Sequence, residues 1–388
     1  MSRATAARPL LLCLSHLRWK GVWQRPQHLM SRASQSFDVV FVEEPLMHDR
    51  GTNWLRMERV LDNVTVATPY LSNDLGLAKI NAVQRYFLKT LMASRDNDSV
   101  VTWYYTPMAL PLTDGIEAQT VVYDCMDELS CFRNAPPQLA AREQDLLAMA
   151  DLVFTGGRSL FEAKRALHDR VHCFPSSVDV EHFLPARGAG PEADDQAHLP
   201  RPRIGYYAVI DERFDTGFLR DVARLKPDWT FVMIGPLAKI TETELPRERN
   251  IHWTGMRAYR DLPAYLRGWD AALMPFAIND ATRFISPTKT PEFLAAGLPV
   301  VSTPVRDVVA DYGGTGLVDI ARTPAEAVAR LEAAMARDRT AWLAAVDRRL
   351  ARMSWGTTWS QMESLIKARL GRSTVAQRLP IASEPAHV

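Results

Sequence analysis

A helix start that could bind an anion is the strongest chemical feature of the sequence. It lies in residues 284–303, FISPTKTPEFLAAGLPVVST. Ser286 is a good N-cap and Pro287 suits the first helical position, so we expect free backbone amides on the three residues that follow: Thr288, Lys289 and Thr290. Free amides at a helix N-terminus bind anions, and the charge of Lys289 strengthens such a site. A diphosphate is the expected ligand.

A carboxylate follows on the same helix. Glu292 lies three residues after Lys289, so the two side chains share a face. At a rise of about 1.5 Å per residue, Glu292 lies about 9 Å along the axis from Ser286, roughly the separation of a nucleotide's diphosphate from its ribose. A carboxylate there can accept hydrogen bonds from both ribose hydroxyls. The alternative is an ordinary capped helix with a Lys/Glu pair that faces solvent.

Further acidic side chains follow an apolar run in YDCMDELS, at Asp124 and Asp127. Two interpretations of Asp127 remain open. It can cap the next helix, or it can lie in a cleft and orient or deprotonate a hydroxyl group.

An aromatic and basic loop occupies residues 16–29, HLRWKGVWQRPQHL. Trp19 and Trp23 can stack on sugar faces, because aromatic rings offer flat apolar surfaces. The basic residues around them can hold acidic or hydroxyl groups: His16, Arg18, Lys20 and Arg25. Pro26 is expected to begin a helix. The alternative is that the tryptophans belong to the core and that the basic residues surround it.

Apolar runs and amphipathic stretches alternate along the chain, as in βαβ units. In the first half we expect strands at residues 10–16, 38–43, 63–68, 99–105, 120–125, 151–156 and 171–175. The main helices between them are expected at residues 26–35, 74–94, 137–150 and 159–167. Continuous apolar strands suit a parallel sheet that is covered on both faces. We therefore predict a doubly wound α/β domain.

The composition changes at residues 185–203, which are rich in Pro, Gly, Ala and acidic residues and lack apolar periodicity. The alternation then restarts, with strands at 203–209, 230–235, 251–255, 271–276, 299–303 and 316–320. We predict two Rossmann-like α/β domains that face a cleft, divided as follows: first domain 1–184, exposed linker 185–202, second domain 203–353, last helix 354–371 and flexible tail 372–388. Ligands of such sheets bind outside the carboxyl ends of the strands.

The composition disfavours several functional classes. Hydrophobic residues make up 47% and charged residues 23% of the 388 residues, which is typical of a folded globular protein. A formal net charge of +1 disfavours a nucleic-acid partner. The four cysteines lack metal-binding spacing, so we expect reduced thiols in a cytoplasmic protein and no metal site. No run approaches the roughly 18 apolar residues of a membrane span, so any membrane association would be peripheral.

The stretch SPTKTPEFLAAGLPVV resembles the donor-site signature of GT-B glycosyltransferases, specifically the large retaining group that contains family 4. In that group, Ser-Pro-x-Lys-x-x-Glu-(Phe/Tyr) leads into Ala-Ala-Gly-x-Pro-Val-Val. Six other pieces are similar in order and spacing to the subgroup with teichuronic-acid-type glycosyltransferases: WQRPQHL, VVYDCMDELSCF, ADLVFTGGRSLFEAK, VDVEHF, IGYYAVIDERFD and LPAYLRGWDAALMPF. The resemblance covers most of the chain.

The resemblance implies a retaining glycosyltransferase of surface polysaccharide synthesis. It would move a sugar from a nucleotide diphosphate sugar to a carbohydrate or lipid-linked acceptor, in the cytoplasm or at the inner face of the membrane. The family holds a cation against the donor phosphates where this chain has Arg213; the alternative is a surface arginine paired with Asp211 or Asp215. Arg213 and Lys289 would stabilise the departing diphosphate without a metal or other cofactor, and UDP is the preferred nucleotide. The last helix would cross back onto the first domain.

Three sets of site residues follow from this interpretation. The donor-binding residues are Arg213, Ser286, Thr288, Lys289, Thr290 and Glu292. The catalytic residues are Asp127, Arg213 and Lys289. The acceptor-binding residues are His16, Arg18, Trp19, Trp23, Arg25 and Asp124.

The chain departs from the family pattern at three places that concern how the sugar is held. Phe284 replaces the first glutamate of the Glu-x7-Glu pair, Ser176-Ser177 replaces Asn-Gly, and Ala208 replaces a common glycine. The missing glutamate leaves a non-catalytic binding partner as one alternative. A nucleotide-sugar epimerase is another, although it has no separate acceptor and so no need of the aromatic loop. No GxGxxG follows the first strand, which disfavours a dehydrogenase.

Overall fold

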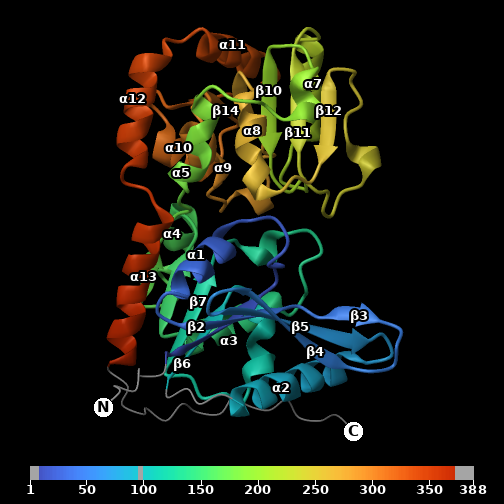
Figure 1. The fold of residues 1–388 in the computed structure, drawn as a ribbon, viewed down its shortest axis with the longest axis vertical. Coiled ribbons are helices and arrows are strands. Elements are labelled where there is room, and N and C mark those ends of the chain that lie inside the picture. Colours follow the sequence, from blue (N-terminus) through green and yellow to red (C-terminus); the bar gives the residue numbers. More distant parts are fainter. Residues whose placement is uncertain (1–7, 95–98, 372–388) are drawn as a thin grey trace.

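The computed structural model describes residues 8–94 and 99–371, which form two α/β domains stacked along the long axis of the molecule (Figure 1). The tail expected at 372–388 lies outside the described residues. Each domain has one sheet with helices on both faces, so the predicted doubly wound architecture is confirmed. Within the described ranges, no helix combines the length and the apolar content that crossing a membrane requires.

The first sheet has the strand order β3-β5-β2-β1-β6-β7-β8-β9, with all these pairs parallel. An antiparallel strand, β4, pairs with β5 and projects with it from the side of the domain (Figure 1). The strands are β1 (Leu10–Ser15), β2 (Asp38–Glu43), β3 (Leu46–His48), β4 (Trp54–Leu61), β5 (Val64–Ser72), β6 (Val100–Tyr104), β7 (Thr120–Cys125), β8 (Leu152–Thr155) and β9 (Val171–Cys173). The sequence analysis assigned no strand to β3 or β4, because both are largely exposed and lack a continuous apolar run.

Two apolar clusters cover the faces of this sheet. The helices that supply them include α1 (Arg25–Ala33), α2 (Leu77–Ala93), α3 (Leu139–Met149) and α4 (Arg158–Lys164), with the short turn η1 (Pro107–Thr113). A second short turn, η2 (Leu129–Cys131), follows β7 and lies outside both clusters. Helix α1 begins as the proline predicts, with Pro26 in its first turn and Gln24 forming a capping box with Gln27.

The second sheet is wholly parallel, in the order β12-β11-β10-β13-β14-β15. Its strands are β10 (Arg203–Tyr207), β11 (Thr230–Ile234), β12 (Ile251–Gly255), β13 (Ala271–Met274), β14 (Val300–Ser302) and β15 (Val318–Ile320). The helices around it are α5 (Val180–Phe183), α6 (Asp194–Ala197), α7 (Thr216–Leu225), α8 (Leu262–Arg267), α9 (Lys289–Ala295), α10 (Arg306–Tyr312), α11 (Pro324–Met335) and α12 (Arg339–Leu350). Short turns complete the domain: η3 (Leu184–Arg187), η4 (Glu242–Glu244), η5 (Tyr259–Asp261) and η6 (Asp280–Thr282).

Most residues of the expected linker at 185–202 are exposed, as predicted, but the segment does not connect the two domains. It contains η3 and α6, and it packs into the core of the second domain. Gln196 is fully buried; its side chain donates to the carbonyl of Tyr265 (2.8 Å) and accepts from the indole of Trp269 (3.0 Å). Val178 belongs to the same core, so the chain passes between the domains near residues 175–177. The polar composition reflects the exposed residues of this segment, whereas its contact with the domain depends on three buried side chains: Ala186, Gln196 and Leu199.

The last helix, α13 (Trp355–Leu370), follows α12 and runs along the first domain beside α1 (Figure 1). Ser354 caps its start by accepting a hydrogen bond from the amide of Thr357 (3.0 Å). One face of the helix is buried in the core of the first domain, through four side chains: Trp355, Trp359, Met362 and Ile366. The two domains are therefore joined twice, once near residues 175–177 and once through α13.

We expect Trp359→Ala to lower the free energy of unfolding by about 3–5 kcal/mol, because it leaves a cavity between α13 and the sheet. The exposed neighbour Ser360 provides the matched control, and Ser360→Ala should change the unfolding free energy by less than about 0.5 kcal/mol. Urea unfolding of both variants measures the difference. Equal stability of the two variants would show that α13 does not dock as described.

A buried ion pair joins α1 to β7. Arg25 and Asp124 are 1% and 0% exposed, and Arg25 donates to both carboxylate oxygens over 2.8–3.1 Å. Arg25 also donates to the carbonyl of Phe174 (2.7 Å), beside the first passage between the domains. Burial raises the pKa of Asp124, and the charge of Arg25 opposes that rise. The pair thus fixes α1, β7 and the end of β9 relative to one another.

We expect Asp124→Asn to destabilise the protein by about 3–5 kcal/mol, because it leaves the Arg25 charge buried without a counter-charge. Asp127→Asn is the matched control. Burial raises the pKa of Asp127, so neutralising this carboxylate should leave the unfolding free energy unchanged or higher. Denaturant unfolding at pH 7 compares the two, and a larger loss for Asp127→Asn would contradict a structural role for Asp124.

Candidate active site

Two adjoining cavities lie in the cleft between the domains, at the carboxyl ends of the strands. The larger one has a volume of about 540 Å³ and the smaller about 100 Å³. Three residues line both, so the cavities adjoin along them: Val22, Ala208 and Lys289. Val22 comes from the loop after β1, Ala208 follows β10, and Lys289 begins α9. Both domains therefore contribute to each cavity.

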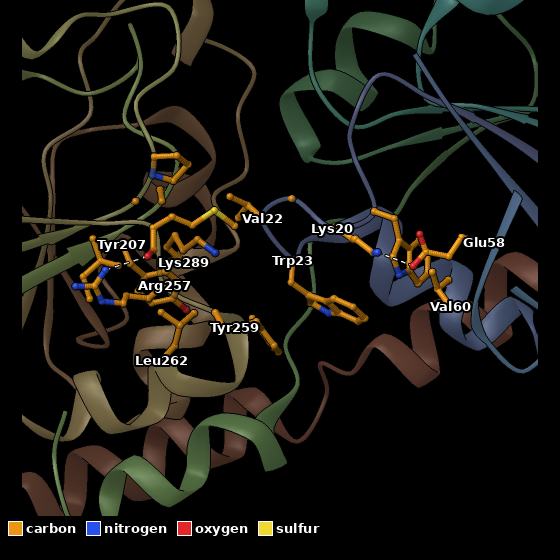
Figure 2. Close-up of a pocket in the computed structure, with 18 of the residues that line it drawn as sticks. Lys20, Val22, Trp23, Glu58, Val60, Tyr207, Arg257, Tyr259, Leu262 and Lys289 are labelled. Carbon is orange, nitrogen blue, oxygen red and sulfur yellow. Dashed lines mark hydrogen bonds and ion pairs between the residues drawn. The ribbon is translucent and has the colours of Figure 1, made fainter. Parts of the chain in front are cut away.

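The larger cavity is mainly aromatic and apolar. Trp19 and Trp23 of the first domain line it, together with Tyr207 and Tyr259 of the second. Trp23 and Tyr259 stack across the cleft, with ring centroids 6.0 Å apart and planes at 27°. Figure 2 shows Trp23 between the Tyr207 and Lys289 side of the cavity and the opposite side, which carries Lys20, Glu58 and Val60. The arrangement suits a flat ring system with polar substituents.

The smaller cavity is charged. Asp127 of the first domain lines it with Arg213 and Lys289 of the second, and Ser286 and Thr288 add hydroxyl groups. These residues follow three different strands, β7, β10 and β13. Arg25 lines this cavity too, but it is 1% exposed and paired with Asp124. Two better exposed cations and one carboxylate thus converge on one small space, which suits a phosphate-bearing ligand beside a group that can accept a proton.

Arg213 is fixed by its neighbour Asp211, to which it donates from Nε (2.9 and 3.1 Å) and Nη2 (2.6 Å). Burial lowers the pKa of Arg213, but the hydrogen bonds and charge of Asp211 outweigh that effect and raise it. The pairing that the sequence left open is therefore present, with Asp211. Asp215 instead caps α7 by accepting from the amide of Phe218 (2.8 Å). Arg213 nevertheless lines the cavity, with its side chain 25% exposed.

Asp127 does not cap a helix. The turn η2 begins at Leu129 with Glu128 at its N-cap, and no side chain caps it. Burial raises the pKa of Asp127, and the charge of Arg213 opposes that rise. Of the two interpretations that the sequence left open, the structure favours a carboxylate in the cleft.

Lys289 and Glu292 form a buried pair, with Nζ 2.7 Å from Oε2. The hydroxyl of Tyr207 donates to the same oxygen, and the ammonium lies over the Tyr207 ring, 4.5 Å from its centroid. The pair is therefore not on a solvated face. Glu292 is 2% exposed and lies behind Lys289 and Tyr207, which themselves line the larger cavity.

The helix after Ser286 begins later than the sequence suggests. Helix α9 starts at Lys289 with Thr288 at its N-cap, so Ser286 and Pro287 precede it in an irregular segment. Ser286 and Thr288 still line the smaller cavity. Thr290 differs from expectation, because it is 1% exposed and its hydroxyl contacts the sulfur of Met274 (3.6 Å). It cannot contact a ligand without rearrangement.

The aromatic loop at 16–29 divides between site and core. Trp23 faces the larger cavity, whereas Trp19 is 6% exposed, packs on Phe41 and only borders the cavity. Arg18 donates to Glu43 (3.1 Å) and to the carbonyl of Glu44 (2.5 Å), which holds it at the edge of the sheet.

Two residues expected to bind an acceptor have another role. Arg25 borders the smaller cavity, but it and Asp124 are 1% and 0% exposed and bind each other, so the expectation that they hold an acceptor is wrong. His16 lies at the cleft end of β1. Burial and the charge of Lys239 lower its pKa to about 4, so the ring is neutral at pH 7. Its Nδ1 is buried without a hydrogen-bond partner among the described residues.

The sequence analysis missed the contribution of the loops after β11 and β12. Gly235 and Pro236 line the larger cavity, as do Met256, Arg257 and Tyr259. Gly235 has φ of +148°, and a Cβ there would lie 1.6 Å from the carbonyl oxygen of Ala208, so only glycine fits. Their position after parallel strands was the available signal. Across residues 8–94 and 99–371, no group of three or more His, Cys, Asp or Glu side chains is arranged to hold a metal ion.

Comparison with known proteins identifies relatives of this chain. Residues 203–337 match the family described as glycosyl transferases group 1. A Bacillus subtilis (strain 168) protein with the provisional name teichuronic acid biosynthesis glycosyltransferase TuaH is 28% identical over 234 residues, which is 54% of this chain and 57% of that protein. The chain thus matches little more than half the length of this relative.

Solved structures match along nearly the whole chain. One is described as trehalose-6-phosphate from E. coli bound with UDP-2-fluoro glucose; it has 13% identity and a TM-score of 0.65, over 96% of this chain and all of that one. Sucrose-phosphate synthase from Thermosynechococcus elongatus has 15% identity and a TM-score of 0.70, over 94% of this chain and all of that one. The chain therefore has the GT-B fold, and residues 203–337 of its second domain are similar to glycosyl transferases group 1.

Proposed function

We propose that this protein is a retaining glycosyltransferase that moves a sugar from a nucleotide diphosphate sugar to a carbohydrate or lipid-linked acceptor in surface polysaccharide synthesis. The observation that carries the proposal is the small charged cavity, in which Arg213, Lys289 and Asp127 meet beside an aromatic cavity. The match to glycosyl transferases group 1 supports the reaction class. The name of the Bacillus subtilis relative supports the polysaccharide setting.

The donor would occupy both cavities. The nucleoside would lie in the larger one, with its ring against Tyr207, Tyr259 and Trp23, and the diphosphate would lie in the smaller one, against Arg213 and Lys289. Lys289 lines both cavities, so its ammonium would lie where the two parts of a nucleotide join. Glu292 is 2% exposed behind Lys289 and Tyr207, which contact its Oε2, so it would accept hydrogen bonds from the ribose through Oε1 once these two side chains shift. UDP is the preferred carrier, in keeping with the UDP-sugar in the E. coli structure.

The transfer reaction would depend on stabilising the negative charge of the departing diphosphate. The bond between the anomeric carbon and the diphosphate oxygen breaks, and the acceptor oxygen forms the new bond to that carbon. Negative charge then builds on the departing diphosphate, where Arg213 and Lys289 stabilise it without a metal ion. Asp127 would accept or orient the proton of the acceptor hydroxyl. Its position in the same cavity as the two cations supports this role.

The acceptor would approach along the first domain. Trp23 and Lys20 line the side of the larger cavity that this domain supplies, and Glu58 of β4 lies beside them. Aromatic faces and paired charges are groups that recognise sugars. A lipid-linked acceptor would require the protein to act at the inner face of the membrane.

Calorimetric titration with UDP, GDP, ADP and dTDP tests the donor site, with UDP expected to bind most tightly. Glu292→Gln should weaken binding by about 1.5–3 kcal/mol, because it removes a buried charged acceptor. Glu332, exposed on α11, provides the control, and Glu332→Gln should bind like the parent.

Arg213→Ala and Lys289→Ala should lower kcat more than they lower nucleotide affinity, because the contribution of these cations grows in the transition state. Failure of all four nucleotides to bind at millimolar concentration would refute the proposal.

Transfer should depend on pH through Asp127. Burial raises the pKa of this carboxylate, so it takes up a proton at a higher pH than an ordinary aspartate. Because a general base must be ionised, kcat should be highest above the raised pKa and should fall as the pH drops through it. Asp127→Asn should lower kcat by about 100-fold or more and should leave nucleotide affinity unchanged. A pH profile of kcat measures this, and an unaltered profile in Asp127→Asn would exclude the assignment.

A further inference from the structure

Phe132 lies between two cations of the opposite domain. It follows η2 in the first domain, and its ring centroid is 5.2 Å from the guanidinium carbon of Arg213 and 4.4 Å from the ammonium of Lys239. A cation over an aromatic face is attracted by the electron-rich face of the ring, most strongly where the pair is shielded from water. One ring thus contacts a cation from each of two loops of the second domain.

The next residue adds hydrogen bonds across the same gap. The amide of Arg133 donates to Oε1 of Glu212 (2.9 Å), and its guanidinium donates to the carbonyl of Lys239 (3.3 Å). Lys239 also pairs with Glu212 (3.3 Å). Its backbone has φ of +61°, a left-handed conformation that non-glycine residues adopt at a cost and that is common at functional sites. Contacts from Phe132 and Arg133 both reach this strained residue.

Both sides of the contact are firmly anchored. In the first domain, Glu128 binds the buried ammonium of Lys164 (2.6 Å), which also binds Glu143 (2.8 Å). In the second domain, the two loops are joined by backbone hydrogen bonds through Ile210, from Ile210 to Pro236 and from Ala238 to Ile210 (both 3.0 Å). The contact therefore joins two rigid parts of the molecule.

The Phe132 ring contacts Arg213, a proposed catalytic residue. Asp211 binds Nε and Nη2 of Arg213, and Phe132 lies against the same guanidinium from the other domain. Asp127 lies five residues before Phe132 in the same loop, so approach of the loop brings both groups to the smaller cavity together.

We propose that Phe132 is a positioning residue: its ring, from the first domain, and Asp211, from the second, together hold the guanidinium of Arg213 in the smaller cavity, so that the cavity is complete only where the two domains meet. Contact between the domains and assembly of the charged cavity are then a single event. The effect on turnover rests on the proposed function, whereas the contact itself does not.

Hydrogen exchange of the free protein tests the contact without any substrate. Phe132→Leu keeps an apolar side chain but removes the ring, whereas Phe132→Tyr keeps the ring. We expect exchange of the Arg133 amide to become about 5- to 20-fold faster in Phe132→Leu and to stay within about twofold of the parent in Phe132→Tyr. Tyr86→Leu, at an exposed aromatic residue on α2, is the control and should match the parent. Unaltered exchange in Phe132→Leu would overturn the inference.

Steady-state kinetics test the positioning role with the same variants. Phe132→Leu should lower kcat by about 5- to 20-fold, leave nucleoside diphosphate affinity within about twofold, and be rescued in Phe132→Tyr. Phe132→Met replaces Phe132→Leu if the latter does not fold. A kcat equal to that of Tyr86→Leu, or no rescue by tyrosine, would overturn the inference. If the parent itself neither binds nucleotides nor transfers sugar, the proposed function fails, and the exchange measurement still decides whether the contact exists.

Discussion

Each parallel sheet presents the carboxyl ends of its strands along one edge, and the site depends on bringing the two edges together. Asp127 follows β7, Arg213 follows β10, and Lys289 begins the helix after β13. A parallel sheet collects such residues at one edge because each return to the sheet passes through a helix. No single domain holds both the carboxylate and the two cations, so the charged cavity exists only where the domains meet.

The domains also meet at a tight contact beside that cavity. Asp307 of α10 accepts a hydrogen bond from the amide of Ser159 (3.1 Å), which lies in the first turn of α4 in the other domain. Neighbouring Gly157 has no room for a side chain, since a Cβ would lie 2.4 Å from Asp307 and 2.7 Å from Ser286. Ser286 lines the smaller cavity. A movement of one domain on the other at this point would therefore reach the proposed diphosphate site directly.

Three basic residues of the cleft region each contact a carboxylate: Arg25 with Asp124, Arg213 with Asp211 and Lys289 with Glu292. A buried charge without a partner is costly, so these pairs allow the cations to be held without a bound anion. The three differ in what surrounds them. All three basic residues line the smaller cavity, but the side chain of Arg25 is only 1% exposed, whereas those of Lys289 and Arg213 are 10% and 25% exposed and can interact with an anion as well as with their carboxylates.

Local patterns in the chain were enough to predict the alternation of strands and helices, the helix start at Pro26, and the cluster of Lys289 and Glu292, because these depend on residues close in sequence. Partners distant in sequence could not be predicted. Asp124 lies 99 residues from Arg25, and nothing local distinguishes it from Asp127, yet one is sealed in the core and the other faces the cleft. In the same way, residues 185–202 have the composition of a linker and are mostly exposed, but Gln196 among them is buried and binds Tyr265 and Trp269 in the second domain. Burial and pairing are properties of the packed domains, and local composition does not contain them.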